Sequence, residues 1–418
     1  MPKIFHRLAL FRGTFAVLIL TSCIQGGGLV SQFLTAFYLS SSEVGVIRAV
    51  ESILAILVLG ASVGTPTLAI RESAAATSLN ERAYLLRRLL VMEMMVGVIA
   101  FVGLLAFHRL VLSNAIIGYA SLIAGIAVLT NSVRVLAGFV QGTQTAPSVS
   151  VILIASTFGS VCVVTGVAHA YSISGWIAGR YLGEMIVLSA LVWHLRGYLF
   201  RRPILVNQSL PSLTLISLGV SANVAQFVRL LCDNLPILGM TAAKVKTDQI
   251  GHFGLATLVL MGPTLIFAVI AQVELPQIVL VRTEHGAVAR RMRRLMRSLL
   301  RSALLFSGIF IVIGVFNRLI FHFPIGDTLD LLIVLSMALP LRVTSLAIGT
   351  VLMALRQYKL SVYINSVEAV LTAPIAYYLA KQFGAKGAAI AFFLGSVLSL
   401  ALHAGVLRAS RLLSSNES

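Results

Sequence analysis

Residues 331–355 read LLIVLSMALPLRVTSLAIGTVLMAL, a stretch with one charged side chain, Arg342, near its middle. A helix that crosses the hydrocarbon core of a bilayer needs about 20 predominantly apolar residues. An arginine inside such a helix costs free energy on insertion, so it tends to face a water-filled cavity or a partner group. The stretch therefore predicts a membrane-spanning helix that carries a cation at membrane depth.

Similar apolar runs recur along the whole chain, separated by short gaps. The gaps leave no room for an inserted soluble domain, and the runs predict an all-α polytopic membrane protein with about 12 transmembrane helices. The expected helices lie at 13–38, 45–70, 88–107, 113–140, 149–169, 174–195, 213–240, 250–281, 298–317, 328–355, 359–380 and 385–407.

The overall composition agrees with this fold class. Of the 418 residues, 58% are hydrophobic and 11% are charged, whereas a soluble domain has about 25% charged residues. The three cysteines, Cys23, Cys162 and Cys232, lie inside apolar runs and form no closely spaced pair, which argues against a disulfide framework or a CxxC metal site. We expect a surface that faces mostly lipid, and no metal centre.

The net charge of +18 raises the alternative of nucleic-acid binding, because basic clusters neutralise phosphates. However, most Lys and Arg residues fall in alternate short gaps between the apolar runs, which is the pattern of cytoplasmic loops. No basic domain stands apart from the helices. We therefore expect no nucleic-acid partner, and we place both termini in the cytoplasm.

The two halves of the chain resemble each other. An apolar span precedes SISGWIA at 172–178 in the first half and GAKGAAIA at 384–391 in the second, so that Gly175 aligns with Gly387. An even number of helices in each half makes the repeats parallel, related by an axis along the membrane normal. We expect two six-helix bundles related by a pseudo-two-fold axis around a central cavity. The expected domains are 1–198 and 213–418, joined by a cytoplasmic linker at 199–212.

Signatures of catalysis are missing from the sequence. It contains no GxxxxGK[ST] phosphate loop, no HExxH, no CxxC and no GxSxG, the patterns that accompany nucleotide hydrolysis, zinc chemistry, redox chemistry and serine hydrolysis. We expect neither an enzyme nor a cofactor, and we name no catalytic residue. Any active transport would draw on an ion gradient, the membrane potential or a partner.

Two arginines within the apolar runs occupy similar places in the two halves, Arg134 in the expected fourth helix and Arg342 in the tenth. If both face one cleft, they form a cationic lumen suited to a pyrophosphate, which guanidinium groups bind bidentately. The alternative is that each arginine snorkels or pairs with a local carboxylate or carbonyl group. The sequence leaves both interpretations open.

Other intramembrane charges come in helical pairs. Arg229 and Asp233 are four residues apart, as are Arg180 and Glu184, so each pair shares a helix face. Such pairs neutralise themselves, or Asp233 exchanges a proton or sodium ion beside the substrate. Arg48 and Glu51 are three residues apart and so share a helix face as well. Three glutamates have no evident local partner and are either structural or coupling sites: Glu93, Glu274 and Glu368.

Two further patterns concern packing and the membrane surface. Glycines at four-residue spacing, Gly175, Gly179 and Gly183, and likewise Gly60 and Gly64, predict small faces for close helix contact. The arginine-rich run 290–301 is expected in a gap between two helices. It indicates inner-side retention charge and contact with anionic lipids, with docking of a partner enzyme as the alternative.

Several loose motifs are similar to those of a known transporter family. They are Ser42-Glu43-Val44-Gly45-Val46, Leu59-Gly60-Ala61 with Arg71, Arg229 and Asp233, Gly251-His252-Phe253-Gly254-Leu255-Ala256, Pro276, and Gly384, Gly387, Ala388 and Ala389. Over nearly its whole length the chain resembles the Wzx-type oligosaccharide flippases, the polysaccharide-transporter branch of the multidrug/oligosaccharidyl-lipid/polysaccharide exporter superfamily. It departs from that pattern at Val44 and at His252, where the family usually has aromatic residues.

The resemblance implies a flippase that moves an undecaprenyl-pyrophosphate-linked repeat unit across the bacterial inner membrane by alternating access, for O-antigen, exopolysaccharide or capsule export. Polysaccharide polymerase and chain-length proteins would be partners. The residues expected to bind the pyrophosphate are Arg134, Arg342, Arg229, Arg48 and Arg180, and those expected to couple an ion are Asp233, Glu51 and Glu368. The alternatives are a cation-coupled multidrug antiporter, a lipid II flippase and a membrane glycan polymerase.

Overall fold

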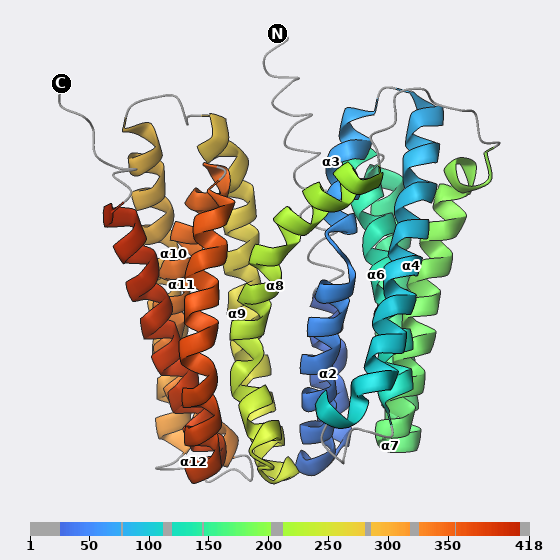
Figure 1. Ribbon diagram of the computed structural model, residues 1–418. Helices are drawn as coiled ribbons and strands as arrows, with labels where there is room; N and C mark the ends of the chain where they lie inside the picture. Colours follow the sequence, from blue (N-terminus) through green and yellow to red (C-terminus); the bar gives the residue numbers. More distant parts are fainter. Residues whose placement is uncertain are drawn as a thin grey trace. The chain divides into compact units, whose positions relative to one another are not determined.

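The computed structural model of the chain describes residues 26–76, 78–111, 119–143, 146–201, 212–280, 286–317, 326–355 and 357–409. These residues form helices, with no strand among them. Residues 26–38 are helical, and the further helices are α2 (Ser41–Ala61), α3 (Thr65–Ala75), α4 (Leu79–Val111), α6 (Ala120–Thr143), α7 (Ala146–Leu199), α8 (Ser212–Ala242), α9 (Thr247–Leu280), α10 (Ala287–Phe316), α11 (Gly326–Ala354) and α12 (Tyr358–Ala409) (Figure 1).

Eight of the described helical stretches are long and apolar enough to cross a membrane. The prediction of an all-α polytopic membrane protein is therefore confirmed, while the count of twelve spans stays a prediction. The expected first helix, 13–38, is described only from residue 26 onward. Residues 202–211 of the expected linker, 199–212, lie outside the described residues, and the division of the chain there also stays a prediction.

Two of the long helices contain a break where the sequence predicts the end of one span and the start of the next. In α7 the break falls at Ser172, with φ 59° and ψ −136°, and in α12 it falls at Gly384, with φ 57° and ψ −133°. The two breaks have nearly the same backbone conformation and the same offset along the chain as Gly175 and Gly387. The helix boundaries expected there are confirmed, and the resemblance between the halves extends to the backbone.

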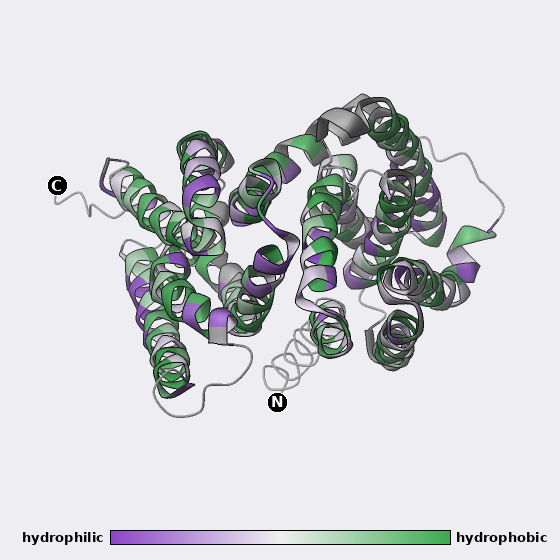
Figure 2. Ribbon diagram, turned by 90° about the horizontal axis from the view of Figure 1, so that it is seen from below, coloured by the Kyte–Doolittle hydropathy of each residue, from purple (hydrophilic) through white to green (hydrophobic). Residues whose placement is uncertain are grey.

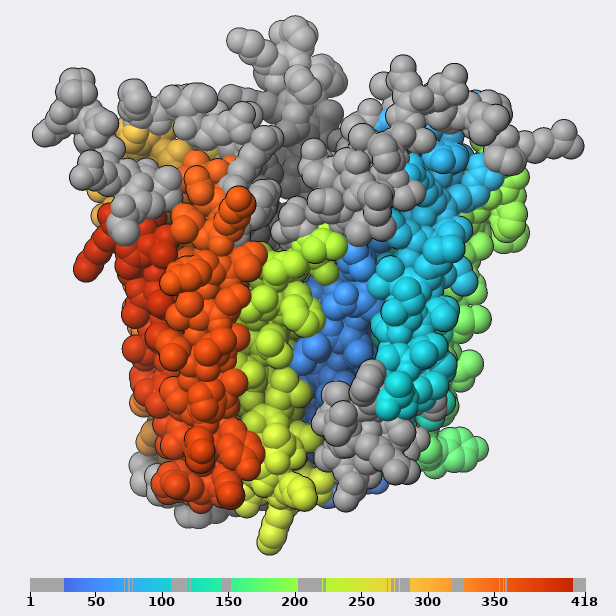
Figure 3. All heavy atoms as spheres, viewed as in Figure 1, coloured from blue at the N-terminus to red at the C-terminus, as the bar shows by residue number. Residues whose placement is uncertain are grey.

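The glycines after each break allow the chain to return close beside the helix it has just left. A Cβ atom on Gly179 would lie 2.8 Å from Val164 Cα, and one on Gly395 would lie 3.1 Å from Thr372 Cγ2. These contacts join residues at similar distances on either side of each break, so the two halves of α7 and of α12 each form an antiparallel pair. Figure 3 shows the two halves of α12 in orange and red. The close packing predicted for Gly179 is confirmed.

Contacts divide the chain into two compact units. Unit 1 comprises Met1–Leu39 and Val50–Phe227, and unit 2 comprises Ser40–Ala49 and Val228–Ser418. Within unit 1, α6 packs against α3, α4 and α7, and within unit 2, α11 packs against α9, α10 and α12. Arg134 lies on α6 and Arg342 lies on α11. The two arginines therefore occupy the central helix of their own units.

Each unit has a buried apolar core and an apolar exterior. The core of unit 1 includes Leu86, Leu136 and Leu195, and that of unit 2 includes Leu299 and Leu335. Large apolar side chains are also exposed along the helices, as on α4, where Met95, Val98 and Ile99 are 57–70% exposed. Seen end-on in Figure 2, the helices of both units are coloured mostly for hydrophobic residues. Such an exterior is suited to lipid and not to water.

The prediction of one helix over 45–70 is wrong. The structure ends α2 at Ala61 and begins α3 at Thr65, and the chain turns at Val63 and Gly64, which have φ values of 47° and 77°. A hydropathy window of about 20 residues averages over this turn, although Ser62, Gly64 and Pro66 interrupt the apolar run there. Gly64 therefore serves as a turn residue with a left-handed backbone, and Gly60 of that predicted pair contacts Phe227 of α8.

The helix predicted at 298–317 begins earlier than expected. It runs from Ala287 to Phe316 as α10. The arginine-rich run therefore lies on the first half of a helix and not in a gap between helices. Arginine has a high helix propensity, but a hydropathy window detects only apolar segments and therefore excludes the arginine-rich run. This correction places the arginines at fixed positions on a helix surface.

Candidate functional site

A cluster of charged side chains in unit 2 is centred on Asp233 of α8. Its Oδ1 atom lies 3.8 Å from Nε of Arg229, one turn earlier on the same helix. The same oxygen also forms an ion pair with the guanidinium group of Arg342, on α11. The pairing of Arg229 with Asp233 expected from their spacing is therefore confirmed. One carboxylate holds two guanidinium groups.

Arg342, on α11, interacts with groups on two other helices, α8 and α12. Besides the ion pair with Asp233, its guanidinium carbon lies 4.4 Å from the centre of the Phe392 ring on α12, a cation–π contact. Arg229 and Glu368 also interact electrostatically with this guanidinium group. The side chain of Arg342 is 15% exposed. The cation is thus largely withdrawn from solvent, but it lies among several groups of both charges.

Pro340 shapes α11 close to this cluster. Proline has no backbone N–H, so the carbonyl group of Ser336, four residues earlier, loses its helical partner. Ser307 on α10 donates its hydroxyl group to Ser336 O at 2.7 Å. An apolar span tolerates proline when a neighbouring helix satisfies the freed carbonyl in this way. The contact also ties α10 to α11 less than two turns before Arg342.

One buried face of α12 adds oxygen atoms to the same unit. Asn365, Glu368 and Thr372 are 3%, 6% and 4% exposed and share this face. The backbone carbonyl of Asn365 accepts a hydrogen bond from Cys232 Sγ at 3.4 Å. In the described part of the chain, Glu368 Oε2 and Thr372 Oγ1 have no hydrogen-bond partner. A buried polar atom without a partner is costly, so these oxygens are suited to a proton, a cation or water.

Unit 1 holds a cluster of the opposite composition. Arg180 on α7 lies between two carboxylates, with Nη2 3.4 Å from Glu184 Oε1 and Nε 3.6 Å from Glu51 Oε1 on α2. Thr130 on α6 donates a hydrogen bond to the same oxygen of Glu184 at 3.0 Å. The side chains are 12–18% exposed. The pairing of Arg180 with Glu184 is confirmed, and here one guanidinium group holds two carboxylates.

A second buried carboxylate in unit 1 belongs to Glu93 of α4, which is 1% exposed. The hydroxyl group of Thr65, the first residue of α3, donates a hydrogen bond to Glu93 Oε2. Arg134 interacts electrostatically with both Glu93 and Glu184. Arg134, on the central helix α6, therefore links Glu93 to Glu184 of the Arg180 cluster.

Arg48 of α2 packs against α9 in unit 2. It is 7% exposed, and its Nη2 atom donates a hydrogen bond to Thr257 Oγ1 on α9 at 3.4 Å. A Cβ atom on Gly254 would lie 3.0 Å from Arg48 Cβ, so the stem of the arginine occupies a glycine notch on α9. Glu51, three residues later, pairs with Arg180 in unit 1.

The structure thus gathers the expected site residues into two groups. Unit 2 brings together Arg229, Asp233, Arg342 and Glu368, and unit 1 brings together Arg180, Glu51 and Arg134. The chamber shared by Arg134 and Arg342 stays a prediction. Glu274, which has no evident partner in the sequence, pairs with Arg291 of α10 at 3.4 Å.

Sequence reasoning missed the neighbours that arrive from distant helices. Thr65, Thr130 and Phe392 contact the charged groups although they are far from them in sequence. Spacing along one helix carries no signal for such contacts. Gly64 before Thr65 and Pro66 in the first turn of α3 are local features that could have marked a helix start there.

Comparisons with known proteins give the fold a context. No family model matches the chain, and no curated protein matches it. Among solved structures, an inward-facing multidrug resistance MATE family transporter of the MOP superfamily matches with a TM-score of 0.75 and 14% identity, over 96% of this chain and 99% of that one. The lipid II flippase MurJ, in an inward closed conformation, matches with a TM-score of 0.65 and 12% identity, over 98% and 89%.

A third similar structure is a MOP superfamily transporter from Pyrococcus furiosus, described as having a binding pocket of reversed polarity that suggests a different function. It matches with a TM-score of 0.66 and 12% identity, over 97% of this chain and 96% of that one. At these identities the likeness shows the fold alone. The chain has the two-lobed helical fold of these membrane transporters.

Proposed function

We propose that this chain is a flippase for an undecaprenyl-pyrophosphate-linked oligosaccharide, which it moves from the inner to the outer leaflet of the bacterial inner membrane by alternating access. The observation that carries this proposal is the Arg229–Asp233–Arg342 cluster within an apolar helical unit. A cation at membrane depth is costly and usually serves a substrate or ion pathway.

The chemistry of the cluster fits a pyrophosphate. Two guanidinium groups converge on one carboxylate oxygen, and guanidinium binds phosphate oxygens bidentately in the same way as it binds carboxylates. A pyrophosphate entering unit 2 would replace Asp233 as the partner of Arg229 and Arg342. Arg134, Arg180 and Arg48 would supply further guanidinium groups for the pyrophosphate during transport.

The same arrangement suggests how an ion could be coupled to transport. Asp233 and a pyrophosphate compete for the same two guanidinium groups, so a proton or sodium ion on Asp233 would release them for the substrate. Glu368, buried nearby with an oxygen that lacks a hydrogen-bond partner in the described residues, is the second coupling residue in unit 2. Glu51 takes the equivalent role in unit 1.

This function implies particular surroundings. Both termini would lie in the cytoplasm, where most of the basic gaps are expected. The substrate would come from membrane-bound glycosyltransfer chemistry, and polysaccharide polymerase and chain-length proteins would consume it on the far side. Neither a cofactor nor a nucleic acid takes part.

The test is a flipping assay with the purified chain in proteoliposomes. The substrate is a fluorescent polyprenyl-pyrophosphate oligosaccharide, and its access to an external quencher is followed with a proton or sodium gradient imposed. We expect protein-dependent flipping that Arg342→Gln reduces strongly. Normal surface glycan in a strain that lacks the gene would contradict the proposal.

A cation-coupled multidrug antiporter is the second candidate, and two observations favour it. A multidrug MATE transporter has the same fold with a TM-score of 0.75, and unit 1 holds more carboxylates than guanidinium groups around Arg180, as a cationic drug would require. Drug sensitivity of the deletion strain, with glycan export unchanged, would select this candidate.

The lipid II flippase and glycan polymerase alternatives are separated by the substrate. A lipid II analogue in the same proteoliposomes tests the first, and the similarity to MurJ supports including it. A polymerase would lengthen the glycan, whereas a flippase leaves its length unchanged, so chromatography of the recovered glycan distinguishes them.

A further inference from the structure

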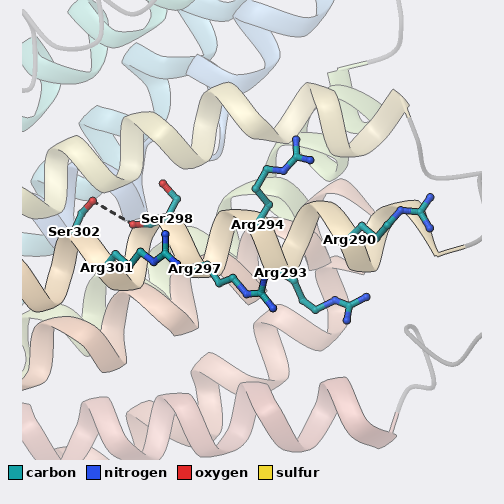
Figure 4. A pocket seen from close by; sticks show the side chains of 7 residues that line it. All are labelled: Arg290, Arg293, Arg294, Arg297, Ser298, Arg301 and Ser302. Atoms are coloured by element: carbon teal, nitrogen blue, oxygen red, sulfur yellow. Dashed lines mark hydrogen bonds between the residues drawn. The ribbon is translucent and has the colours of Figure 1, made fainter.

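Five arginines line one face of α10 in unit 2. They occupy positions 290, 293, 294, 297 and 301, a spacing of three and four residues that keeps them on a single stripe of the helix. All five are exposed. Figure 4 shows the Arg293 and Arg297 side chains extending from the same side of the helix. The basic run is thus an ordered surface with fixed spacing.

These arginines surround a pocket of about 630 Å³, and two serines complete its lining (Figure 4). Within the described ranges, none of the five forms an ion pair with a carboxylate, whereas Arg291, on another face of the same helix, pairs with Glu274. The helix therefore separates a neutralised arginine from five that retain their charge. The lining residues are Arg290, Arg293, Arg294, Arg297, Ser298, Arg301 and Ser302.

The arginine stripe continues directly into an apolar stripe on the same side of α10. Leu304, Leu305, Val312 and Val315 follow Arg301 at helical spacing and are 40–64% exposed. In a membrane protein, exposed apolar side chains on a spanning helix contact acyl chains. The boundary between the arginine stripe and the apolar stripe therefore lies at the level of the lipid headgroup phosphates.

We propose that this face of α10 binds an anionic phospholipid of the surrounding bilayer, one that carries two separate phosphodiester groups. Its acyl chains lie along Leu305 and Val312, and its phosphates are held by the arginines, with Arg297 and Arg301 nearest the chains. The hydroxyl groups of Ser298 and Ser302 lie in the same pocket and supply neutral donors.

The number and spread of the arginines favour a lipid with two phosphates. The stripe covers about 16 Å of helix at about 1.5 Å per residue, which is more than one phosphodiester or one compact pyrophosphate can contact. Guanidinium groups bind phosphate oxygens with charge-assisted hydrogen bonds, so two separated phosphates use more of the stripe. This inference does not depend on the transported substrate, because the site faces the bilayer lipids.

The test is native mass spectrometry of the purified full chain, titrated with a diphosphatidylglycerol, a phosphatidylglycerol and a phosphatidylcholine. We expect the diphosphatidylglycerol to bind with the highest affinity. The variant is Arg297→Gln/Arg301→Gln, and the control is Arg196→Gln/Arg201→Gln, which removes the same charge from exposed arginines outside α10. At about 1 kcal/mol for each arginine near anionic lipid, the variant should bind roughly 30-fold more weakly.

Each outcome decides the proposal. A loss confined to the α10 variant, with unchanged size-exclusion elution and helicity, supports it. Equal losses in the variant and the control would show general attraction to anionic lipid and would overturn it. So would equal affinity for the three lipids. Tighter binding of a polyprenyl pyrophosphate than of diphosphatidylglycerol, lost in the α10 variant, would assign the site to the transported lipid instead.

Discussion

Unit 1 and unit 2 build similar bundles but balance their buried charge in opposite ways. In unit 1, Arg180 lies between the carboxylates of Glu51 and Glu184. In unit 2, Asp233 lies between the guanidinium groups of Arg229 and Arg342. The first centre has an excess of anionic partners and the second an excess of cationic ones.

This difference separates two roles for arginine within a membrane fold. Arg180 already has a carboxylate on either side, so its main effect is to keep two buried anions neutral. Arg342 and Arg229 share one carboxylate, so they retain the capacity to bind another anion. We therefore expect substitution of Arg180 to lower the stability more than substitution of Arg342 does, and substitution of Arg342 to lower transport more than substitution of Arg180 does.

The largest effect is expected from Arg180→Gln. Removal of this cation breaks the ion pairs of both Glu51 and Glu184 in a largely buried place and leaves Glu184 with the longer-range attraction of Arg134; breaking such a pair costs about 3 kcal/mol. The melting temperature in detergent should fall clearly below that of Arg342→Gln, in which Asp233 keeps Arg229. Adding Glu51→Gln to Arg180→Gln should restore part of the loss. A lower melting temperature for Arg342→Gln than for Arg180→Gln would contradict the difference proposed between the two units.

Arg342→Gln is expected to reduce flipping of a pyrophosphate-linked lipid about 100-fold. A hydrogen bond to a charged group is worth about 1.5–3 kcal/mol, and the upper value corresponds to that factor. Arg342→Lys keeps the charge but loses the bidentate geometry, so its rate should lie between those of Arg342→Gln and the unchanged protein. Rates are measured in proteoliposomes, with Arg196→Gln as the control. Full flipping activity of Arg342→Gln would show that the arginine cluster of unit 2 is not the anion-binding site.

The two units also differ in the residue at the helix break, which is Ser172 in α7 of unit 1 and Gly384 in α12 of unit 2. We expect Gly384→Ser to lower the stability by about 1–2 kcal/mol, because its left-handed φ of 57° strains a residue with a side chain. Gln249 adds to this cost, since its Oε1 atom accepts a hydrogen bond from Ala385 N–H at 3.3 Å and occupies the space that a Cβ atom would need. Thermal unfolding in detergent measures the change.

The smallest effect is expected from the reciprocal substitution in unit 1. Ser172 has a φ of 59° in a region where residues other than glycine are rare, so Ser172→Gly should relieve strain and raise the stability by about 1 kcal/mol. The melting temperature should rise slightly, with transport unchanged. A decrease would mean that the serine side chain stabilises the break by more than the strain it bears.

The sequence allowed the long helices and several local pairs to be predicted. The breaks near Ser172 and Gly384 were expected because polar or small residues interrupt two apolar runs there. Arg229 with Asp233, and Arg180 with Glu184, were expected because a four-residue spacing brings side chains together on any helix. The turn at Gly64 was missed, because a hydropathy window of about 20 residues averages over residues 62–67 and records neither φ nor ψ.

The sequence by itself determined that this chain is a helical membrane protein with cations at membrane depth, because the free energy of inserting a helix into lipid depends mainly on that helix's own apolar and charged residues. Only the tertiary structure decided which charges meet. Asp233 with Arg342, Glu51 with Arg180, and Glu93 with Thr65 all join different helices. Their contacts depend on how the helices pack, and no spacing within one helix encodes that packing.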